Sequence, residues 1–261
     1  MLMKAVTATR SRKAPLPAFL HYFLLALPSL LLVGSLAACS TQTVSTTAFT
    51  QIDTEKSRIS EDELLDVGIA IFEPGLDDIP HKREELTFAD VRLAETQFVS
   101  YQLAQTLQGT GGWGIVRVIP NDLSAVDVAV HGTILQSDGQ TMVVKVSVKD
   151  SSGKLWYDKE YKEVVGKYSY DSRNRRSEDA FQGLYNRIAN DMLAYRQHNL
   201  DHNGLLTIRT ISRLQFARTF APQAFDQYLT TSGKGLIKLN RLPASDDLAS
   251  PRYSRHLIAL H

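Results

Sequence analysis

Apolar and polar positions recur along the chain in patterns that predict both strands and helices. A short apolar run at Val67–Phe72 stops at Pro74-Gly75 and predicts a buried strand. Apolar residues at helical intervals then predict a long helix over about 88–108 with a broad buried face. The side chains expected to face inward from this helix are Val91, Ala94, Phe98, Val99, Tyr101, Leu103 and Leu107.

The next segment predicts a meander of three strands over about 126–165, preceded by a short strand at Ile115–Ile119. Valines alternate with polar residues on both sides of Asp138-Gly139, a dipeptide typical of tight hairpin turns. Gly153 supplies the positive φ that a second turn needs, before a strand that contains Trp156. Consecutive strands joined in this way pair antiparallel.

A second amphipathic pattern predicts a helix over about 178–197, with Phe181, Leu184, Ile188 and Met192 on one face. The order β-α-β-β-β-β-α predicts an α+β fold, in which a mixed, mainly antiparallel sheet carries both helices on one face. Weaker patterns after residue 200 predict a small α/β extension. Its expected elements are a strand at Leu205–Ile211, a helix at Pro222–Thr230 and a strand at Gly235–Leu239.

The amino-terminal region has the pattern of a secretory signal over residues 1–38. Four basic residues precede an apolar run at Ala18–Leu36, and residues 1–38 contain no acidic residue. His21 and Pro28 interrupt the apolar run. A retained transmembrane anchor is the alternative, disfavoured because no basic stop-transfer cluster follows. Ser/Thr-rich residues 39–60 predict a flexible tether, ahead of a domain over 61–200 and an extension over 201–261 to which the sequence assigns no role.

Charge and cysteine content narrow the classes of function. The chain has one cysteine, which excludes an internal disulfide and a multi-cysteine metal site. Its net charge is +1, of which residues 1–38 contribute +4, so the remainder carries −3. The part from Leu205 onward carries +5, which is far from the basic footprint of a nucleic-acid-binding protein.

The end of the apolar run, Leu36-Ala37-Ala38-Cys39, resembles the lipobox of bacterial lipoproteins. The resemblance implies cleavage before Cys39 and acylation of that residue. We therefore expect a covalent lipid on Cys39 and no cofactor. Such a lipid would anchor the protein stably to a membrane. By the sorting rule of that family, Ser40 after the cysteine implies export to the outer membrane, with the domain facing the periplasm.

The predicted meander is similar to the N-terminal domain of TolB and to the related domain of the curli secretion-channel lipoprotein. The similarity covers about residues 65–197, and the segments that carry it are Val126-Asp127, His131–Ile134, Asp138-Gly139, Val144–Asp150 and Gly153–Trp156. It implies an envelope protein that binds another protein or a polymer, with no catalytic residue to carry over. The long membrane-spanning hairpins of the curli channel have no counterpart here.

Candidate chemistry is sparse. His198 and His202 have i,i+4 spacing, but Asn199 stands where a zinc protease has Glu, so we expect no metal there. His131 is expected to be an ordinary strand histidine. Aromatic and arginine side chains near turns form the candidate interaction surface, with core packing and a solvated loop as the alternatives. They are Trp113, Trp156, Tyr168, Tyr170, Arg173, Arg175 and Arg176.

These observations favour a non-enzymatic outer-membrane lipoprotein that acts as an accessory or scaffold in envelope assembly or export. Its expected partners are the membrane, through the lipid, and an envelope protein or an anionic envelope polymer. A ring-forming subunit of a secretion or polysaccharide-export system is the alternative, and the sequence leaves the oligomeric state open. A hydrolase of envelope polymers is a minor alternative because no catalytic motif supports it.

Overall fold

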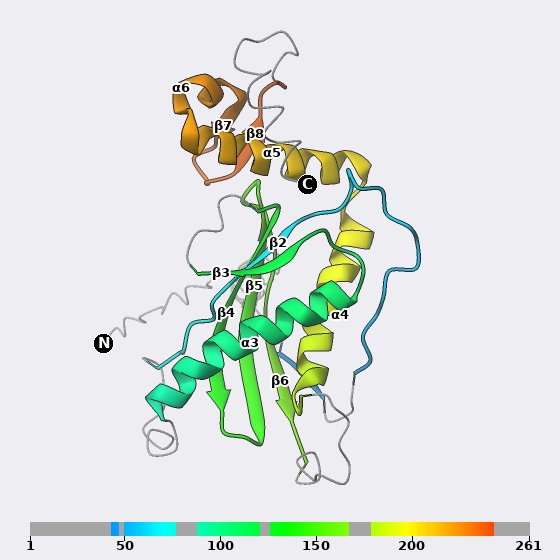
Figure 1. Ribbon diagram of the computed structural model, residues 1–261, viewed down its shortest axis with the longest axis vertical. Helices are drawn as coiled ribbons and strands as arrows, with labels where there is room; N and C mark the ends of the chain where they lie inside the picture. Colours follow the sequence, from blue (N-terminus) through cyan, green and yellow to red (C-terminus); the bar gives the residue numbers. More distant parts are fainter. Residues whose placement is uncertain (1–42, 47–49, 77–87, 121–125, 167–178, 243–261) are drawn as a thin grey trace, which may run out of the picture. The chain divides into compact units, whose positions relative to one another are not determined.

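The computed structural model describes residues 43–46, 50–76, 88–120, 126–166 and 179–242 (Figure 1). All of them belong to one of two compact units of the chain, Gln42–His261. The predicted signal peptide and Cys39 lie outside the described residues. Among the described helices, none combines the length with the apolar composition that crossing a membrane requires.

A six-stranded mixed sheet lies at the centre of this unit, with the strand order β1-β6-β5-β4-β2-β3. The strands are β1 Thr43–Thr46, β2 Val67–Ala70, β3 Val116–Ile119, β4 Val128–Ser137, β5 Thr141–Asp150 and β6 Leu155–Val164. The predicted meander is confirmed, since β4 pairs antiparallel with β5 and β5 with β6. The remaining junctions, β1 with β6, β2 with β4 and β2 with β3, are parallel.

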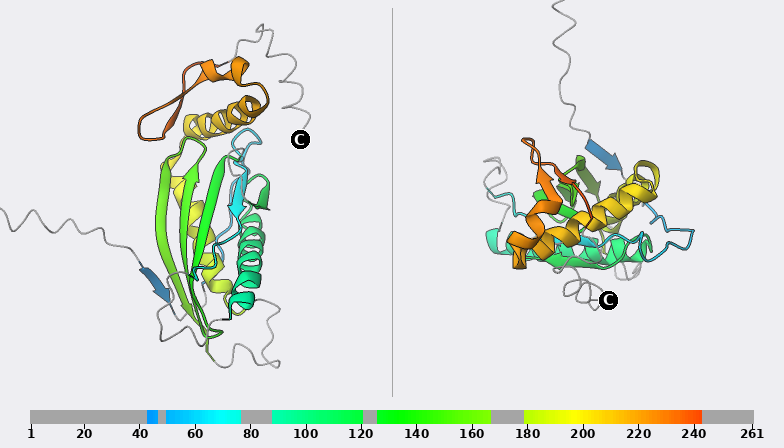
Figure 2. Two further views of the ribbon diagram at one scale, coloured as in Figure 1. Left: turned by 90° about the vertical axis from the view of Figure 1, so that its left-hand side faces the viewer. Right: turned by 90° about the horizontal axis from the view of Figure 1, so that it is seen from above.

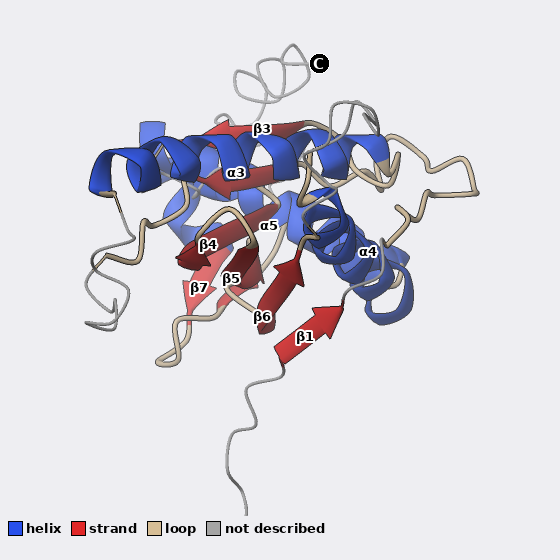
Figure 3. Cartoon of the chain, turned by 90° about the horizontal axis from the view of Figure 1, so that it is seen from below, coloured by secondary structure: helices blue, strands red, loops and turns tan. Residues whose placement is uncertain are grey.

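Two long helices, α3 Ala89–Gly109 and α4 Gln182–Asn199, cover one face of the sheet, as predicted (Figures 2 and 3). Alternate residues of the meander point to this face and are buried, among them Val130 of β4 and Val144 and Val146 of β5. Leu184 and Ile188 of α4 meet them in one hydrophobic core. Burying a large aliphatic side chain contributes about 1.5–3 kcal/mol to the free energy of folding, so this layer is the main source of stability.

The inward face of α3 differs from the prediction. Val99, Leu103 and Leu107 are buried as expected, whereas Val91 and Tyr101 are more than half exposed. The buried stripe instead contains Arg92, whose guanidinium donates to the carbonyl oxygens of Pro74 (3.1 Å), Ile134 (3.2 Å) and Ser137 (3.3 Å). A polar side chain takes the inward position because it satisfies strand-end carbonyls that would otherwise be buried without donors.

Part of the predicted flexible tether is instead held against α4. Asn186 Nδ2 donates to the carbonyl of Thr50 (2.8 Å), and Asn190 exchanges hydrogen bonds with the backbone of Gln51 (2.9 Å) and Asp53 (2.8 Å). Residues 43–46 also form an edge strand of the sheet. Short polar residues in this segment thus hydrogen-bond through their backbone, which a reading of composition alone does not reveal.

The carboxy-terminal extension begins with a long helix, α5 His202–Phe220, where the sequence predicts a short strand. Asp201 caps it by accepting from the Gly204 amide (2.8 Å). Leu205 and Ile208 join the main core, whereas Ile211 and Leu214 join a second cluster. The remaining elements also contribute side chains to the second cluster. They are α6 Pro222–Phe225, a 3-10 turn at Asp226–Tyr228, β7 Leu229–Thr231 and β8 Ile237–Leu239.

Candidate functional site

The face of the sheet opposite α3 and α4 carries polar side chains from the three strands of the meander. Cross-strand pairing places His131 opposite Ser147 and Ser147 opposite Asp158, in one row across β4, β5 and β6. The next row contains Lys145, opposite Thr133 on β4 and Glu160 on β6. An antiparallel sheet with one face on the core and one face solvated gives this alternation.

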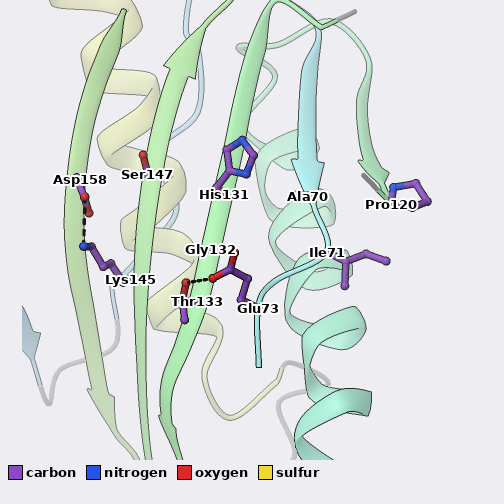
Figure 4. Close-up of a pocket in the computed structure, with 10 residues that line it drawn as sticks. All are labelled: Ala70, Ile71, Glu73, Pro120, His131, Gly132, Thr133, Lys145, Ser147 and Asp158. Carbon is purple, nitrogen blue, oxygen red and sulfur yellow. Dashed lines mark hydrogen bonds and ion pairs between the residues drawn. The ribbon is translucent and has the colours of Figure 1, made fainter. Parts of the chain in front are cut away.

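A hollow of about 410 Å³ lies on this open face (Figure 4). Ala70 of β2 contributes a short side chain to its lining. Glu73, which follows β2, accepts a hydrogen bond from the Thr133 hydroxyl (3.1 Å) at the edge of the hollow. The other lining residues are Ile71, Pro120, His131, Gly132, Lys145, Ser147 and Asp158.

The charges around the hollow are partly compensated. Lys145 Nζ lies 3.3 Å from Asp158 Oδ2, and both side chains are nearly half exposed, so this pair is worth little in stability. Partial burial lowers the pKa of His131, Lys149 lowers it further, and Glu73 opposes both effects. The imidazole is therefore neutral at neutral pH and offers one donor and one acceptor.

The row of His131, Ser147 and Asp158 contains the residue types of a hydrolase triad in an arrangement that does not match one. Ser147 lies between the other two, so the carboxylate does not orient the imidazole, and Asp158 pairs with Lys145 instead. Within the described part of the chain, no hydrogen bond joins Ser147 to His131. The site presents hydroxyl, carboxylate, ammonium and imidazole groups to a polar ligand.

The two tryptophans predicted to contribute to an interaction surface are in the core instead. Trp113 is 3% exposed and Trp156 is 7% exposed. Trp156 stacks on Tyr195 of α4, with ring centroids 4.6 Å apart, and Trp113 lies on its other side at 6.2 Å. The Trp156 indole also donates to the buried Asp150 carboxylate (3.0 Å). The other members of the predicted surface, Tyr168, Tyr170, Arg173, Arg175 and Arg176, lie outside the described residues.

The two histidines with helical spacing are separated by a helix boundary. His198 lies in α4 and its Nδ1 is 2.7 Å from the carbonyl of Ala194, whereas His202 opens α5 and its Nδ1 is 2.5 Å from Glu63 Oε1. The Glu63 carboxylate raises the pKa of His202. The described residues contain no cluster of histidine and carboxylate groups that could hold a metal ion.

Sequence reasoning missed most of the hollow. Glu73, Lys145 and Asp158 come from three separate segments, and none of them was predicted as a site residue. The available signal was the period-two alternation, which assigns Lys145 and Ser147 to the solvent face of a strand. The register that brings His131 level with Ser147 and Asp158 is a tertiary feature.

No family model and no curated protein matches this sequence. The chain has a distant likeness to the crystal structure of protein XCC0632 from Xanthomonas campestris, of family model DUF330. The identity is 11%, the TM-score is 0.37, and the match covers 60% of this chain and 98% of that one. A likeness at this level carries no argument about function.

Proposed function

We propose that this protein is a non-enzymatic, lipid-anchored protein of the bacterial outer membrane that acts as a periplasm-facing scaffold in envelope assembly or export. The resemblance of Leu36–Cys39 to a lipobox supports the anchor and the location. The resemblance of the meander to the TolB N-terminal and curli-channel modules supports a binding role. The open sheet face carries the proposal, because it presents a polar hollow on a rigid support.

The open face suits a protein partner that contributes polar side chains. Its groups alternate in sign, with Lys145 beside Asp158 and the neutral His131 near Glu73. Such a surface favours hydrogen-bonded recognition over capture of a densely charged polymer. A protein segment with hydroxyl, amide and single charged groups is the partner that we propose for it.

The anchor would hold this sheet near the membrane. Thr43, the first residue of β1, follows Cys39 by four positions. Four extended residues span at most about 14 Å. A lipid on Cys39 would therefore keep β1 close to the lipid headgroups, and a partner that engages the open face would be one that works beside the membrane.

Replacement of Cys39 tests the anchor in the native host. We expect Cys39→Ala to abolish incorporation of a clickable palmitate analogue and to leave an unprocessed precursor in the inner membrane. Ser40→Asp is the matched variant, since by the sorting rule it should keep the label while moving the protein to the inner membrane. Normal processing of Cys39→Ala to a soluble periplasmic form would contradict the anchor.

A photo-crosslinking amino acid on the open face tests the scaffold role. We expect position 147 to yield one reproducible envelope-protein adduct that Lys145→Glu reduces. The control position is Ala194, which is exposed on α4 away from the open face. Adducts of equal yield at both positions, or none at position 147, would contradict partner binding at the hollow.

A further inference from the structure

The outer face of α3 carries an apolar ridge, which we define as Val91, Ala94, Phe98 and Tyr101. All four residues are exposed, with exposed fractions of 56% for Val91, 47% for Phe98 and 57% for Tyr101. The opposite face of the same helix is already packed on the sheet through Val99 and Leu103. The ridge is therefore additional to what the fold of one chain requires.

The spacing of the ridge is that of a helix-pairing seam. Its residues follow one another at intervals of three, four and three positions, which is the a/d pattern of a heptad repeat. Residues at this spacing form one stripe along a helix, available to a second helix lying alongside.

We propose that the ridge pairs with the ridge of a second copy of this chain, with the two α3 helices antiparallel about a two-fold axis level with Thr96. In this register Val91 faces Tyr101 of the second copy, and Ala94 faces Phe98 of the second copy. Every layer then combines a small side chain with an aromatic one. Alternation of large and small residues across facing positions is what interdigitated packing needs, and a two-fold interface must be self-complementary in this way.

Charge on α3 favours this occupant over a membrane surface. The acidic residue Asp90 lies in the first turn of the helix. The one basic residue of the helix, Arg92, is 3% exposed, is paired with Glu95 (Nε to Oε2, 3.1 Å) and donates to backbone carbonyls, so no basic side chain of α3 is free beside the ridge. Helices that lie on anionic lipid carry lysine and arginine on their polar side. Antiparallel pairing also separates the acidic amino-terminal turns of the two helices and aligns their dipoles favourably.

The area is sufficient for a modest dimer. An aromatic side chain covers about 150–250 Å², so the half-exposed Phe98 and Tyr101 together offer roughly 200 Å². With Val91, Ala94 and the flanking polar residues of both chains, the pair would bury about 1,000 Å² in total, the lower bound for a specific interface. An interface at this lower bound is expected to be weak and reversible.

This pairing goes beyond the proposed scaffold role and does not depend on it. Helix α3 lies on the face of the sheet opposite the open face (Figure 3), and the ridge residues are exposed, so both open sheet faces of a dimer remain accessible. Two partner-binding faces per assembly would follow. Loss of the lipid anchor or of the partner would leave the pairing itself intact in solution.

Light scattering of the full-length protein in detergent, over a range of concentrations, tests the pairing. We expect a reversible monomer–dimer equilibrium, and Phe98→Glu should weaken it by about 30-fold or more, as loss of a central anchor residue does. The matched control is Phe220→Glu, since Phe220 is 69% exposed on α5 and lies off the ridge. It should leave the equilibrium unchanged.

A size exchange tests the register. Ala94→Phe alone should weaken the dimer because it overfills the layer that residues 94 and 98 share. Phe98→Ala alone should weaken it because it leaves a gap in the same layer. The double variant should restore the dimer, since it only exchanges the two side-chain sizes. A photo-crosslinker at position 101 should attach near Val91 of the second copy. A monomer at all concentrations, a dimer insensitive to Phe98→Glu, attachment near position 101 or a larger ring would each overturn the proposal.

Discussion

Gly132 occupies the middle of β4 at a point where the ring of Phe72 packs against the strand. A Cβ built at this position would come within 2.2 Å of that ring, whose residue is 2% exposed. The absence of a side chain at Gly132 therefore makes room for Phe72 in the core. Glycine weakens a strand on entropic grounds, so this close approach is the reason for its presence.

We expect Gly132→Ala to lower the free energy of unfolding by about 1–3 kcal/mol, because overfilling a packed site displaces the neighbouring ring. Denaturant titration of the full chain in detergent would measure it. The double variant Gly132→Ala with Phe72→Leu should recover part of the loss. A change below about 0.5 kcal/mol would mean that the ring relocates without cost.

Asp127 is a second residue whose surroundings are unusual. It is 4% exposed, it accepts from the Asp66 amide (2.8 Å), and it accepts from the Ser212 hydroxyl of α5. Burial raises its pKa, and these hydrogen bonds oppose the rise. The folded state thus holds the Asp127 proton to a higher pH than the unfolded state, so stability falls as the pH rises through the raised pKa.

Ser212→Ala should destabilise the protein by about 1–3 kcal/mol at about pH 8, because the buried carboxylate loses a donor. The loss should shrink towards acidic pH, where Asp127 is protonated and needs that donor less. Urea titrations at a series of pH values from about 8 down to about 4 would follow this change. Ser57, which is exposed and hydrogen-bonds to Glu55 through its backbone amide, supplies the control variant Ser57→Ala. A penalty independent of pH would contradict the role of the carboxylate.

Among the elements, β6 and α4 are joined by a buried ion pair. Arg187 Nη2 lies 3.2 Å from Glu163 Oε2, and the two side chains are 8% and 9% exposed. Burial raises the pKa of Glu163 and lowers that of Arg187, in both cases more than the partner compensates. Arg187 Nε and Nη1 also have no hydrogen-bond partner among the described residues. The desolvation cost of the pair is therefore incompletely offset.

We expect Glu163→Gln to cost about 3–5 kcal/mol, because it leaves the Arg187 charge buried and unpaired. The double replacement Glu163→Leu with Arg187→Met should be neutral or stabilising, since it removes both charges and fills their volume. Thermal unfolding of Glu163→Gln, of the single variants Glu163→Leu and Arg187→Met, and of the double variant would measure the coupling. If the effects of the single replacements on stability simply add in the double variant, the pairing is contradicted. The exposed pair Lys145–Asp158 is the control, in which little coupling is expected.

The same elements show what could be predicted from the sequence. Period-two alternation and tight-turn glycines are local signals, so β4, β5 and β6 were predicted correctly. Helix α3 was predicted correctly as an element but not in orientation, because it has two apolar stripes. Hydrogen bonds of Arg92 to Ile134 of β4 and of Ser100 to Ala70 of β2 favour the orientation that the structure has. Helix α5 was missed because the segment Leu205–Ile211 is rich in β-branched residues. Packing of Leu205 and Ile208 on the core overrides that propensity.

The candidate site was less predictable than the fold. Trp113 and Trp156 were candidates for the interaction surface because they lie near turns, with core packing as the alternative. The structure has the alternative, since Trp156 stacks on Tyr195 and Trp113 stacks on Trp156. The hollow depends on the register of β4, β5 and β6 and on the position of Glu73 after β2. Sequence patterns specify which face of a strand a residue occupies, whereas the register between strands follows from turns and packing together.

For the molecule as a whole, helix α5 connects the two hydrophobic clusters. Ile208 belongs to the main core and Leu214 to the second cluster, six residues further along the same helix. Ser151 and Gln215 also link the second hairpin turn to α5, through hydrogen bonds of 2.5 Å to the Ile208 carbonyl and 2.6 Å to the Ser151 carbonyl. The described part of the extension, residues 201–242, is therefore continuous with the domain.

We expect Ile208→Ala and Leu214→Ala each to lower the free energy of unfolding by about 2–5 kcal/mol. Both should shift one common transition, because a continuous helix transmits the loss from one cluster to the other. Far-ultraviolet circular dichroism and hydrogen exchange of β7 and β8 would report the two regions separately. Two transitions, with Leu214→Ala affecting only the later part of the chain, would contradict a single cooperative unit.

The aromatic stack also determines how this protein can be observed by optical methods. Both tryptophans of the chain lie in it, at 3% and 7% exposure, on the side of the sheet that α4 covers. Intrinsic emission therefore originates from one dry location, and it should move to longer wavelength when water enters the core. Occupation of the open sheet face or of the α3 ridge leaves that location untouched. Tryptophan fluorescence would report on folding and remain silent during binding.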